Sequence, residues 1–270
     1  MDEQHELQAC EGWWRRNQMV VGAPRGNNRP YPRRGQSGES VTVRIVALPL
    51  SISNAYLLLG DRPVLVDAGK PGEEERLLDL LHQHGIAPSD LSLVVLTHGH
   101  TDHAGSVNAV ARAGVPIAIG ADDAGLLERG VNEQLPVTGF PGRILRPVIT
   151  RMTFAGASPQ VLVRESLRLD AYGIGAAMVP VPGHTAGSCV VLVDDGDAVV
   201  GDLLRGGFAF ARIRPHHPVR HFFAEDVAGV RRGVDLVLEH DPQKLYVGHG
   251  GPNVHVADVR RRLDSIAPPN

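Results

Sequence analysis

The sequence predicts an α/β domain in which mixed β-sheets pack against helices. Three observations predict this class. Short apolar and β-branched runs recur along the chain, single amphipathic segments separate many of them, and other runs follow one another across tight turns. Intervening helices are typical of parallel strand pairing, whereas tight turns are typical of antiparallel pairing. We therefore expect both kinds of pairing in one layered domain.

The composition agrees with a folded protein of this class. A chain of 270 residues with an apolar fraction of 43% can bury a sizeable core. Its net charge of −3 is too small for general attraction to nucleic acid, and no run approaches the ~18 apolar residues of a membrane-spanning helix. Two cysteines form no disulfide framework. We expect a cytoplasmic protein with neither a nucleic-acid nor a membrane partner; a homo-oligomer is left open.

Residues 1–40 differ from the rest of the chain. They are rich in glycine, proline, asparagine and arginine, and they show no apolar periodicity. We expect a flexible N-terminal extension at 1–40, with a basic binding arm as the alternative, followed by one catalytic domain at 41–270.

The first strands and helix follow directly from local signals. Residues 41–48, 55–59 and 64–66 are apolar or β-branched runs broken by proline and glycine, which predicts three strands. Pro71 then opens a helix whose first turn is acidic, as the helix dipole favours, and Gly85 ends it.

The middle of the chain alternates strand and helix signals. The fully apolar run at 91–96 predicts a buried strand. Helices are expected at 104–112 and 121–129, on either side of a strand at 115–119. Residues 130–158, rich in glycine, proline and arginine, predict an irregular insertion.

The second half returns to short strands and ends in helices. Strands are expected at 160–163, 177–181, 189–193, 198–201 and 245–247, and helices at 225–239 and 254–266. Cys189 falls in one of these apolar strands and is expected to be a core residue rather than a reactive thiol.

The segment after the strand at 91–96 carries the strongest chemical signal. His98, His100, Asp102 and His103 place four metal-binding side chains within six residues. Imidazole and carboxylate suit zinc, and also iron or manganese. Two histidines two residues apart in an extended segment can face one ion, and the adjacent aspartate and histidine can face a second. The pattern predicts a metal site of two ions.

This His-x-His-x-Asp-His segment resembles the defining element of the metallo-β-lactamase superfamily. The resemblance extends from about residue 41 to the C-terminus, because the later loops of that family also match in order, at 182–188, 201–204 and 246–251. Residues 67–69 match its early Asp-containing motif. The resemblance implies a four-layer αββα sandwich of two mixed β-sheets flanked by helices.

The resemblance also implies a dinuclear centre, expected to hold two Zn²⁺, with iron or manganese as alternatives. One ion would be held by His98, His100 and His184, and the other by Asp102, His103 and His249, with Asp202 bridging them and Asp67 supporting the ligands from behind.

Two such cations lower the pKa of a shared water, so a hydroxide exists near neutral pH. The expected reaction is therefore hydrolysis of a carboxylic ester, thioester or lactone, as in the glyoxalase II-like and lactonase-like branches, with Asp102 also a candidate catalytic residue for proton handling. The alternatives are an iron-dependent persulfide dioxygenase, a phosphodiesterase, a weak β-lactamase and a non-catalytic binding module. Asp202 argues against β-lactam specialisation, because zinc β-lactamases usually lack an aspartate there.

A basic stretch after Asp202 is the candidate substrate-binding segment. It holds four arginines and three histidines between 205 and 221, and no acid occurs before Glu225. Guanidinium groups bind carboxylate and phosphate in bidentate fashion, so an anionic small-molecule substrate is expected, with a solvated basic loop as the alternative. The candidate substrate residues are Arg205, Phe208, Phe210 and Arg212.

Overall fold

The computed structural model describes residues 42–133, 135–208 and 213–268, which lie in one compact unit spanning 34–270. The extension predicted at 1–40 lies outside the described residues. Within the described part of the chain, no helix is both long enough and apolar enough to cross a bilayer.

The first sheet has six strands in the order of the sequence. They are β1 (Arg44–Pro49), β2 (Asn54–Leu59), β3 (Val64–Val66), β4 (Leu93–Leu96), β5 (Ile117–Gly120) and β6 (Val161–Val163). The pairs β1–β2 and β2–β3 are antiparallel, and each pair from β3 to β6 is parallel. The expected mixture of pairings is therefore present within one sheet.

The second sheet also has six strands, in the order β14-β13-β10-β9-β8-β7. They are β7 (Leu167–Arg168), β8 (Ala176–Pro180), β9 (Cys189–Val193), β10 (Ala198–Gly201), β13 (Lys244–Val247) and β14 (Asn253–His255). Of the strand pairs described in this sheet, β10–β13 is parallel and the others are antiparallel. A separate hairpin is formed by β11 (Arg205–Phe208) and β12 (Ile213–Val219).

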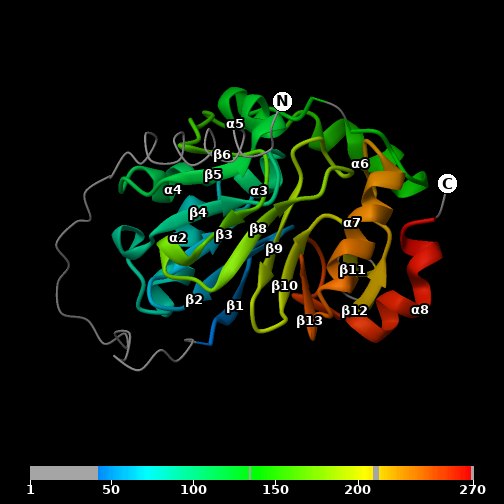
Figure 1. Cartoon of the computed structure of the whole chain (residues 1–270). Helices are drawn as coiled ribbons and strands as arrows, with labels where there is room; N and C mark the ends of the chain where they lie inside the picture. The colour runs from blue at the N-terminus through cyan, green and yellow to red at the C-terminus, as the bar shows by residue number, and fades with distance from the viewer. Residues whose placement is uncertain (1–41, 134, 209–212, 269–270) are drawn as a thin grey trace, which may run out of the picture. The chain divides into compact units, whose positions relative to one another are not determined.

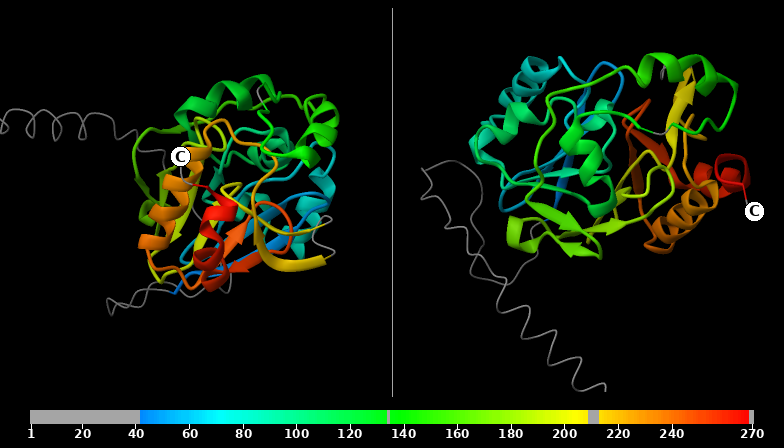
Figure 2. Two further views of the ribbon diagram at one scale, coloured as in Figure 1. Left: turned by 90° about the vertical axis from the view of Figure 1, so that its right-hand side faces the viewer. Right: turned by 90° about the horizontal axis from the view of Figure 1, so that it is seen from above.

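The two sheets pack face to face and helices cover their outer sides (Figures 1 and 2). Tyr56 and Val95 of the first sheet share one buried cluster with Met178 and Val191 of the second, which forms the central core. On the other face of the second sheet, Val200 packs in a second cluster with residues of the C-terminal helices. The expected four-layer αββα architecture is confirmed.

The helices lie close to their expected positions. They are α2 (Glu74–Gln83), α3 (Thr101–Ala104), α4 (Asn108–Ala111), α5 (Ala124–Arg129), α7 (Val227–Glu239) and α8 (Val256–Ile266). The helix expected at 104–112 is split into α3 and α4, and the first turn of the one expected at 121–129 is a 3₁₀ turn, Ala121–Asp123.

The expected irregular insertion contains a helix, α6 (Phe140–Ile149), so that part of the prediction was wrong. Its apolar residues Phe140, Ile144 and Val148 point to solvent, and Pro147 lies inside it. The strands β7, β11, β12 and β14 were also not predicted. They are short or rich in glycine and proline, which are depleted in strands.

Candidate metal centre

The topology brings the polar loops of both sheets to one place. His98 and His100 follow the end of β4, and Asp102 and His103 lie in α3. From the second sheet, Asp202 comes directly after β10, and the loop with His249 follows β13. Because β10 and β13 are parallel neighbours, their carboxyl ends meet at the same edge.

His184, in the loop between β8 and β9, completes one group with the first two histidines. His100 Nδ1 lies 3.1 Å from His184 Nε2, and one ligand atom from each of His98, His100 and His184 lies within 4.8 Å of the others. All three side chains are buried.

The second group lies beside the first. His103 Nε2 lies 3.2 Å from His249 Nε2, which lies 3.3 Å from Asp102 Oδ2. Asp202 stands between the two groups, since its Oδ2 lies 3.3 Å from His249 Nε2 and 3.4 Å from His184 Nε2. The structure thus brings the seven expected ligand side chains into one cluster.

The donor atoms fit divalent cations. Among the described residues, the buried atoms His98 Nε2, His100 Nε2 and Asp202 Oδ1 have no hydrogen-bond partner. A buried polar group without a partner is costly unless something compensates it. Imidazole nitrogens that converge with two carboxylates are the ligands that zinc and related cations take. Metal ions held by these groups would supply the missing compensation.

Groups behind the cluster fix which nitrogen of each ring faces inward. His103 Nδ1 lies 2.8 Å from Asp67 Oδ2, and His249 Nδ1 lies 2.6 Å from the carbonyl oxygen of Ile52. A proton on Nδ1 leaves Nε2 as the inward lone pair in both rings. Asp67 also accepts from Thr97, and its φ of 60° is rare outside glycine. The structure therefore places Asp67 behind the cluster, where the resemblance positions it.

Asp123 is a buried residue near the centre that the sequence did not single out. Its carboxylate accepts hydrogen bonds from Gly99 N, Gly187 N and Thr185 Oγ1, at 2.8, 2.8 and 2.7 Å. Burial raises the pKa of Asp123, and these three bonds oppose the rise. No local motif marks this residue, because its partners lie in loops distant along the chain.

His221 was also missed as a member of the cluster. It is buried, its Nε2 lies 3.1 Å from Asp202 Oδ2, and it forms a further group of potential ligands with His184 and Asp202. In the sequence it is one of three histidines in the basic stretch, and nothing there separates it from His216, which is exposed.

Burial and the nearby carboxylates shift the pKa values of the clustered histidines in opposite directions. Burial lowers the pKa of His100 and of His184 to about 4, although Asp202 opposes it. Burial also acts to lower the pKa of His249, but Asp202 and Asp102 outweigh it and raise the value to about 10. In the metal-free chain, protons therefore compete with cations mainly on the His249 side of the cluster.

The candidate substrate residues lie in different surroundings. Arg205 is half-buried, with its guanidinium carbon 3.9 Å from the ring centroid of Phe222 and its Nη1 donating to Gly207 O at 2.7 Å. Burial lowers the pKa of Arg205 to about 10, against the pull of Asp202, so the side chain stays cationic at neutral pH. Phe208 is exposed. Phe210 and Arg212 lie outside the described residues.

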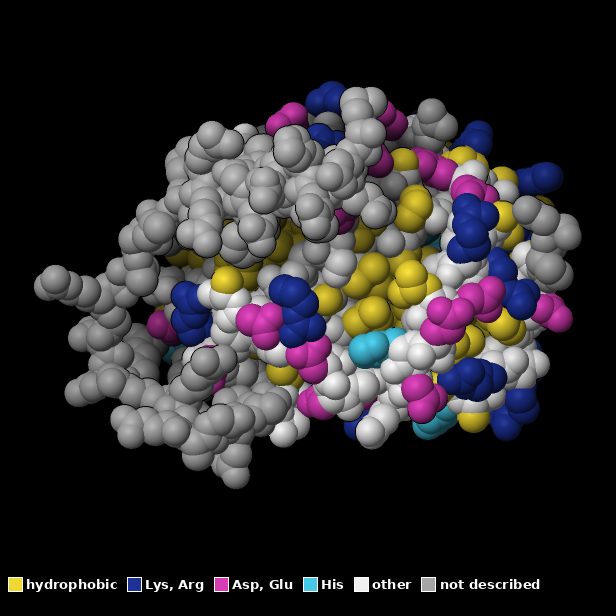
Figure 3. Space-filling model, in the orientation of Figure 1, with side chains coloured by type: hydrophobic (Ala, Val, Ile, Leu, Met, Phe, Trp, Pro, Cys, Tyr) yellow, Lys and Arg dark blue, Asp and Glu magenta, His cyan; other side chains and the backbone are white. Residues whose placement is uncertain are grey.

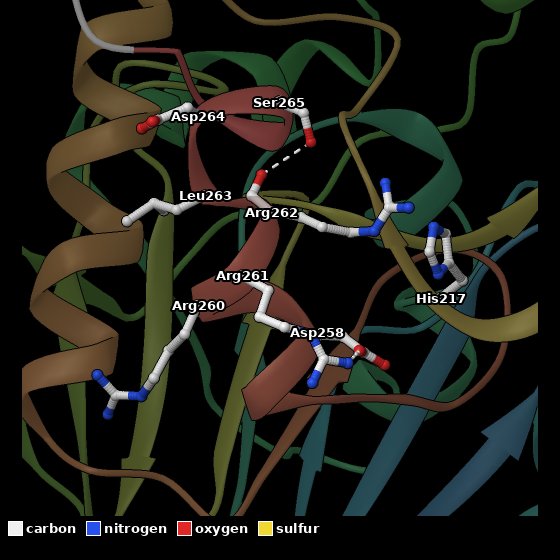
Figure 4. A pocket seen from close by; sticks show the side chains of 8 residues that line it. All are labelled: His217, Asp258, Arg260, Arg261, Arg262, Leu263, Asp264 and Ser265. Atoms are coloured by element: carbon white, nitrogen blue, oxygen red, sulfur yellow. Dashed lines mark hydrogen bonds and ion pairs between the residues drawn. The ribbon is translucent and has the colours of Figure 1, made fainter.

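Phe208 packs near His217, with ring centroids 5.6 Å apart. His217 lines a surface hollow together with residues of α8 (Figure 4). Among the described residues, none of the seven expected ligands lines this hollow. On the face shown in Figure 3, acidic and basic side chains are interspersed rather than gathered into a patch of one sign.

Comparisons with known proteins agree with this architecture. The family model described as the metallo-β-lactamase superfamily matches residues 48–258. "Uncharacterized protein YobT" of Bacillus subtilis is 28% identical over 207 residues, which are 73% of this chain and 82% of that protein. "Probable metallo-hydrolase MJ0888" of Methanocaldococcus jannaschii is 26% identical over 203 residues, which are 73% of this chain and 87% of that protein.

Solved structures show the same fold at low identity. The BLEG-1 B3 metallo-β-lactamase superimposes with a TM-score of 0.60 at 21% identity, covering 81% of this chain and 97% of that one. The family model spans strands of both sheets and the loops that carry all seven expected ligand side chains. The chain belongs to the metallo-β-lactamase superfamily.

Proposed function

We propose that this metal-dependent hydrolase binds two zinc ions and cleaves a carboxylic ester, thioester or lactone in the cytoplasm. The observation that carries the proposal is the position of Asp202. Its Oδ2 lies within 3.4 Å of a histidine nitrogen from each group, His184 on one side and His249 on the other. A single carboxylate that faces both groups supports a pair of ions that share it.

The bound cations would supply a hydroxide near neutral pH and a positive field for an anionic transition state. One ion would be held by His98, His100 and His184. The other would be held by Asp102, His103 and His249, and Asp202 would contact both ions.

The chain's own residues keep this set in place. Asp67 fixes His103 through Nδ1, and the Ile52 carbonyl fixes His249. Asp102, with its Oδ2 3.3 Å from His249 Nε2, is the carboxylate proposed to receive a proton during turnover.

We further propose an anionic substrate recognised by Arg205. This residue lies at the start of β11, three positions after Asp202, and the next residue, Gly206, donates through its amide to His249 O at 2.8 Å. Arg205 Nη1 donates to Gly207 O, but the buried Nε of Arg205 has no hydrogen-bond partner among the described residues. A substrate carboxylate on the Nε edge would satisfy that donor.

A substrate panel combined with metal analysis tests the proposal. The full-length protein would be stripped with chelator, reloaded with zinc, iron or manganese, and assayed on esters, thioesters, lactones, β-lactams and phosphodiesters. The expected result is two zinc ions per chain and turnover of an ester, thioester or lactone. One iron per chain with oxygen consumption, or turnover of phosphodiesters alone, would overturn it.

Arg205→Lys and Arg205→Ala examine substrate charge separately. Both are expected to raise KM for an anionic substrate and to leave KM for its neutral analogue unchanged, because only the anion uses the guanidinium fork. Equal effects on both substrates would contradict the role of Arg205.

A further inference from the structure

His221 lies inside the cluster without a role in the family's pattern of seven ligands. We propose that His221 is a positioning residue: its Nε2–H donates to Asp202 Oδ2 and holds that carboxylate between the two metal groups, and the ring does not bind metal. The inference rests on the proposed dinuclear site, and it adds a residue on which that site depends.

The direction of the hydrogen bonds supports donation by His221. His221 Nδ1 lies 3.2 Å from the amide of Phe223, which donates, and His221 Nε2 faces the Asp202 carboxylate, which only accepts; both contacts are satisfied when Nδ1 presents its lone pair. A neutral imidazole carries one proton, which must then be on Nε2. This nitrogen lies 3.1 Å from Asp202 Oδ2, within hydrogen-bond range.

In His184, by contrast, Phe223 favours the tautomer with its proton on Nδ1. The carbonyl oxygen of Phe223 lies 3.0 Å from His184 Nδ1 and accepts its proton, which leaves the lone pair of His184 Nε2 facing the cluster. The same oxygen lies 3.1 Å from His221 Nδ1, but a proton on that nitrogen would leave the Nε2 lone pair facing the Asp202 carboxylate, two acceptors in contact. Phe223 and Asp202 together therefore make His184 a ligand and His221 a donor.

The insertion at 130–158 holds this segment in place. Thr138 N donates to Phe222 O at 2.9 Å, Ala224 N donates to Pro136 O at 3.0 Å, and the Thr138 hydroxyl donates to His221 O. A side chain at Gly142 would lie 2.6 Å from Phe222 O, so only glycine allows α6 to approach so closely. The insertion thereby fixes both the backbone of His221 and the two groups of Phe223.

Two substitutions separate a donor from a ligand. In His221→Gln the amide group can still donate to Asp202, but the imidazole nitrogen is lost; in His221→Phe the ring shape is kept and the donor is lost. Zinc affinity would be measured on the metal-free proteins by competition with a chromogenic chelator. Loss of a supporting hydrogen bond lowers metal affinity by about 10- to 100-fold, which is expected for His221→Phe, whereas His221→Gln should stay near the wild-type value.

His216→Phe is the matched control, because His216 is exposed in β12, close to His221 in the sequence. The zinc affinity of this variant should equal that of the wild type. Equal losses in His221→Gln and His221→Phe would show that the ring is a ligand, and an unchanged His221→Phe would show that it has no role. Either result overturns the proposal.

If a variant fails to fold, the protonation of His221 can be measured on the unsubstituted protein. Long-range ¹H–¹⁵N correlation spectra of the zinc-loaded protein should show His221 protonated on Nε2 with a free Nδ1. A metal-coordinated His221 nitrogen, or a proton on Nδ1, would contradict the assignment. If the wild-type chain binds no zinc, the dinuclear proposal fails instead, and the tautomer in the metal-free protein still reports on His221.

Discussion

The carboxylate of Asp123 accepts a hydrogen bond from the amide of Gly99 at 2.8 Å. Gly99 separates the first two histidines of the motif, and the same carboxylate binds Thr185 and Gly187, which follow His184 in its loop. The two loops come from different sheets, so one buried side chain sets the distance between ligands that are far apart in sequence.

Asp123→Asn should weaken both the fold and the metal centre. The asparagine oxygen can still accept, but its NH₂ group faces a donor, so at least one buried amide loses its partner at a cost of about 1–3 kcal/mol. Urea unfolding of the metal-free protein would measure this loss. Asp122→Asn, at the exposed neighbouring position, should leave the free energy of unfolding unchanged. Equal stability of the two variants would contradict the linking role of Asp123.

Asp102→Ala should remove one of the two ions and leave a folded domain. Asp102 and His249 are expected to hold the same ion, and their ligand atoms lie 3.3 Å apart. The central core does not include this residue, so the fold should persist. We expect metal content to fall from two ions to one, and turnover to fall by at least the roughly 10- to 100-fold that loss of a group supporting a ligand causes. Metal analysis and circular dichroism of one sample, with exposed Asp79→Ala as the control, would check this. Near-normal turnover would rule out a two-metal mechanism.

The short-range part of the site was predictable from the sequence, and the long-range part was not. The spacing of the ligand residues at 98–103 is visible in a single chain, whereas His184, Asp202 and His249 were expected from the resemblance of their loops to the family's motifs. Asp123 and His221 act through contacts with residues 62 and 19 positions away, Thr185 and Asp202, and no local pattern encodes those contacts.

The fold shows the same division. Buried strands such as β4 are continuous apolar runs, so periodicity finds them. Helix α6 has apolar residues on its solvent side and a proline in its interior, so both the burial pattern and the proline rule indicate a loop. Its position depends on contacts such as Val137 with Phe223, which only the folded chain brings together.

The Cys189 thiol should be inert in the folded protein. It lies in β9 with 2% exposure, and burial raises its pKa to about 12. Because the unfolded thiol ionises near pH 8.5, this group's contribution to stability is complete below that pH and is lost as the pH rises towards 12. In a Cys10→Ser background, Ellman's reagent at pH 8 should react only after addition of denaturant. Rapid stoichiometric labelling without denaturant would contradict the burial of Cys189.

Gly248→Ala should impair the metal centre more than the fold. A Cβ at this position would lie 2.2 Å from Asp202 Oδ1 and 2.7 Å from His103 Cε1. Side chains can move aside at modest cost in stability, but these two are expected ligands, and their movement separates them from the other donors. Lower zinc affinity and turnover are expected, with little change in the thermal unfolding of the metal-free protein. Gly139→Ala is the matched control, because among the described residues a Cβ there would meet only Pro141 Cδ, at 3.9 Å. If Gly248→Ala bound zinc as tightly as this control, Asp202 and His103 would not need their observed positions, and the proposed shared centre would be wrong.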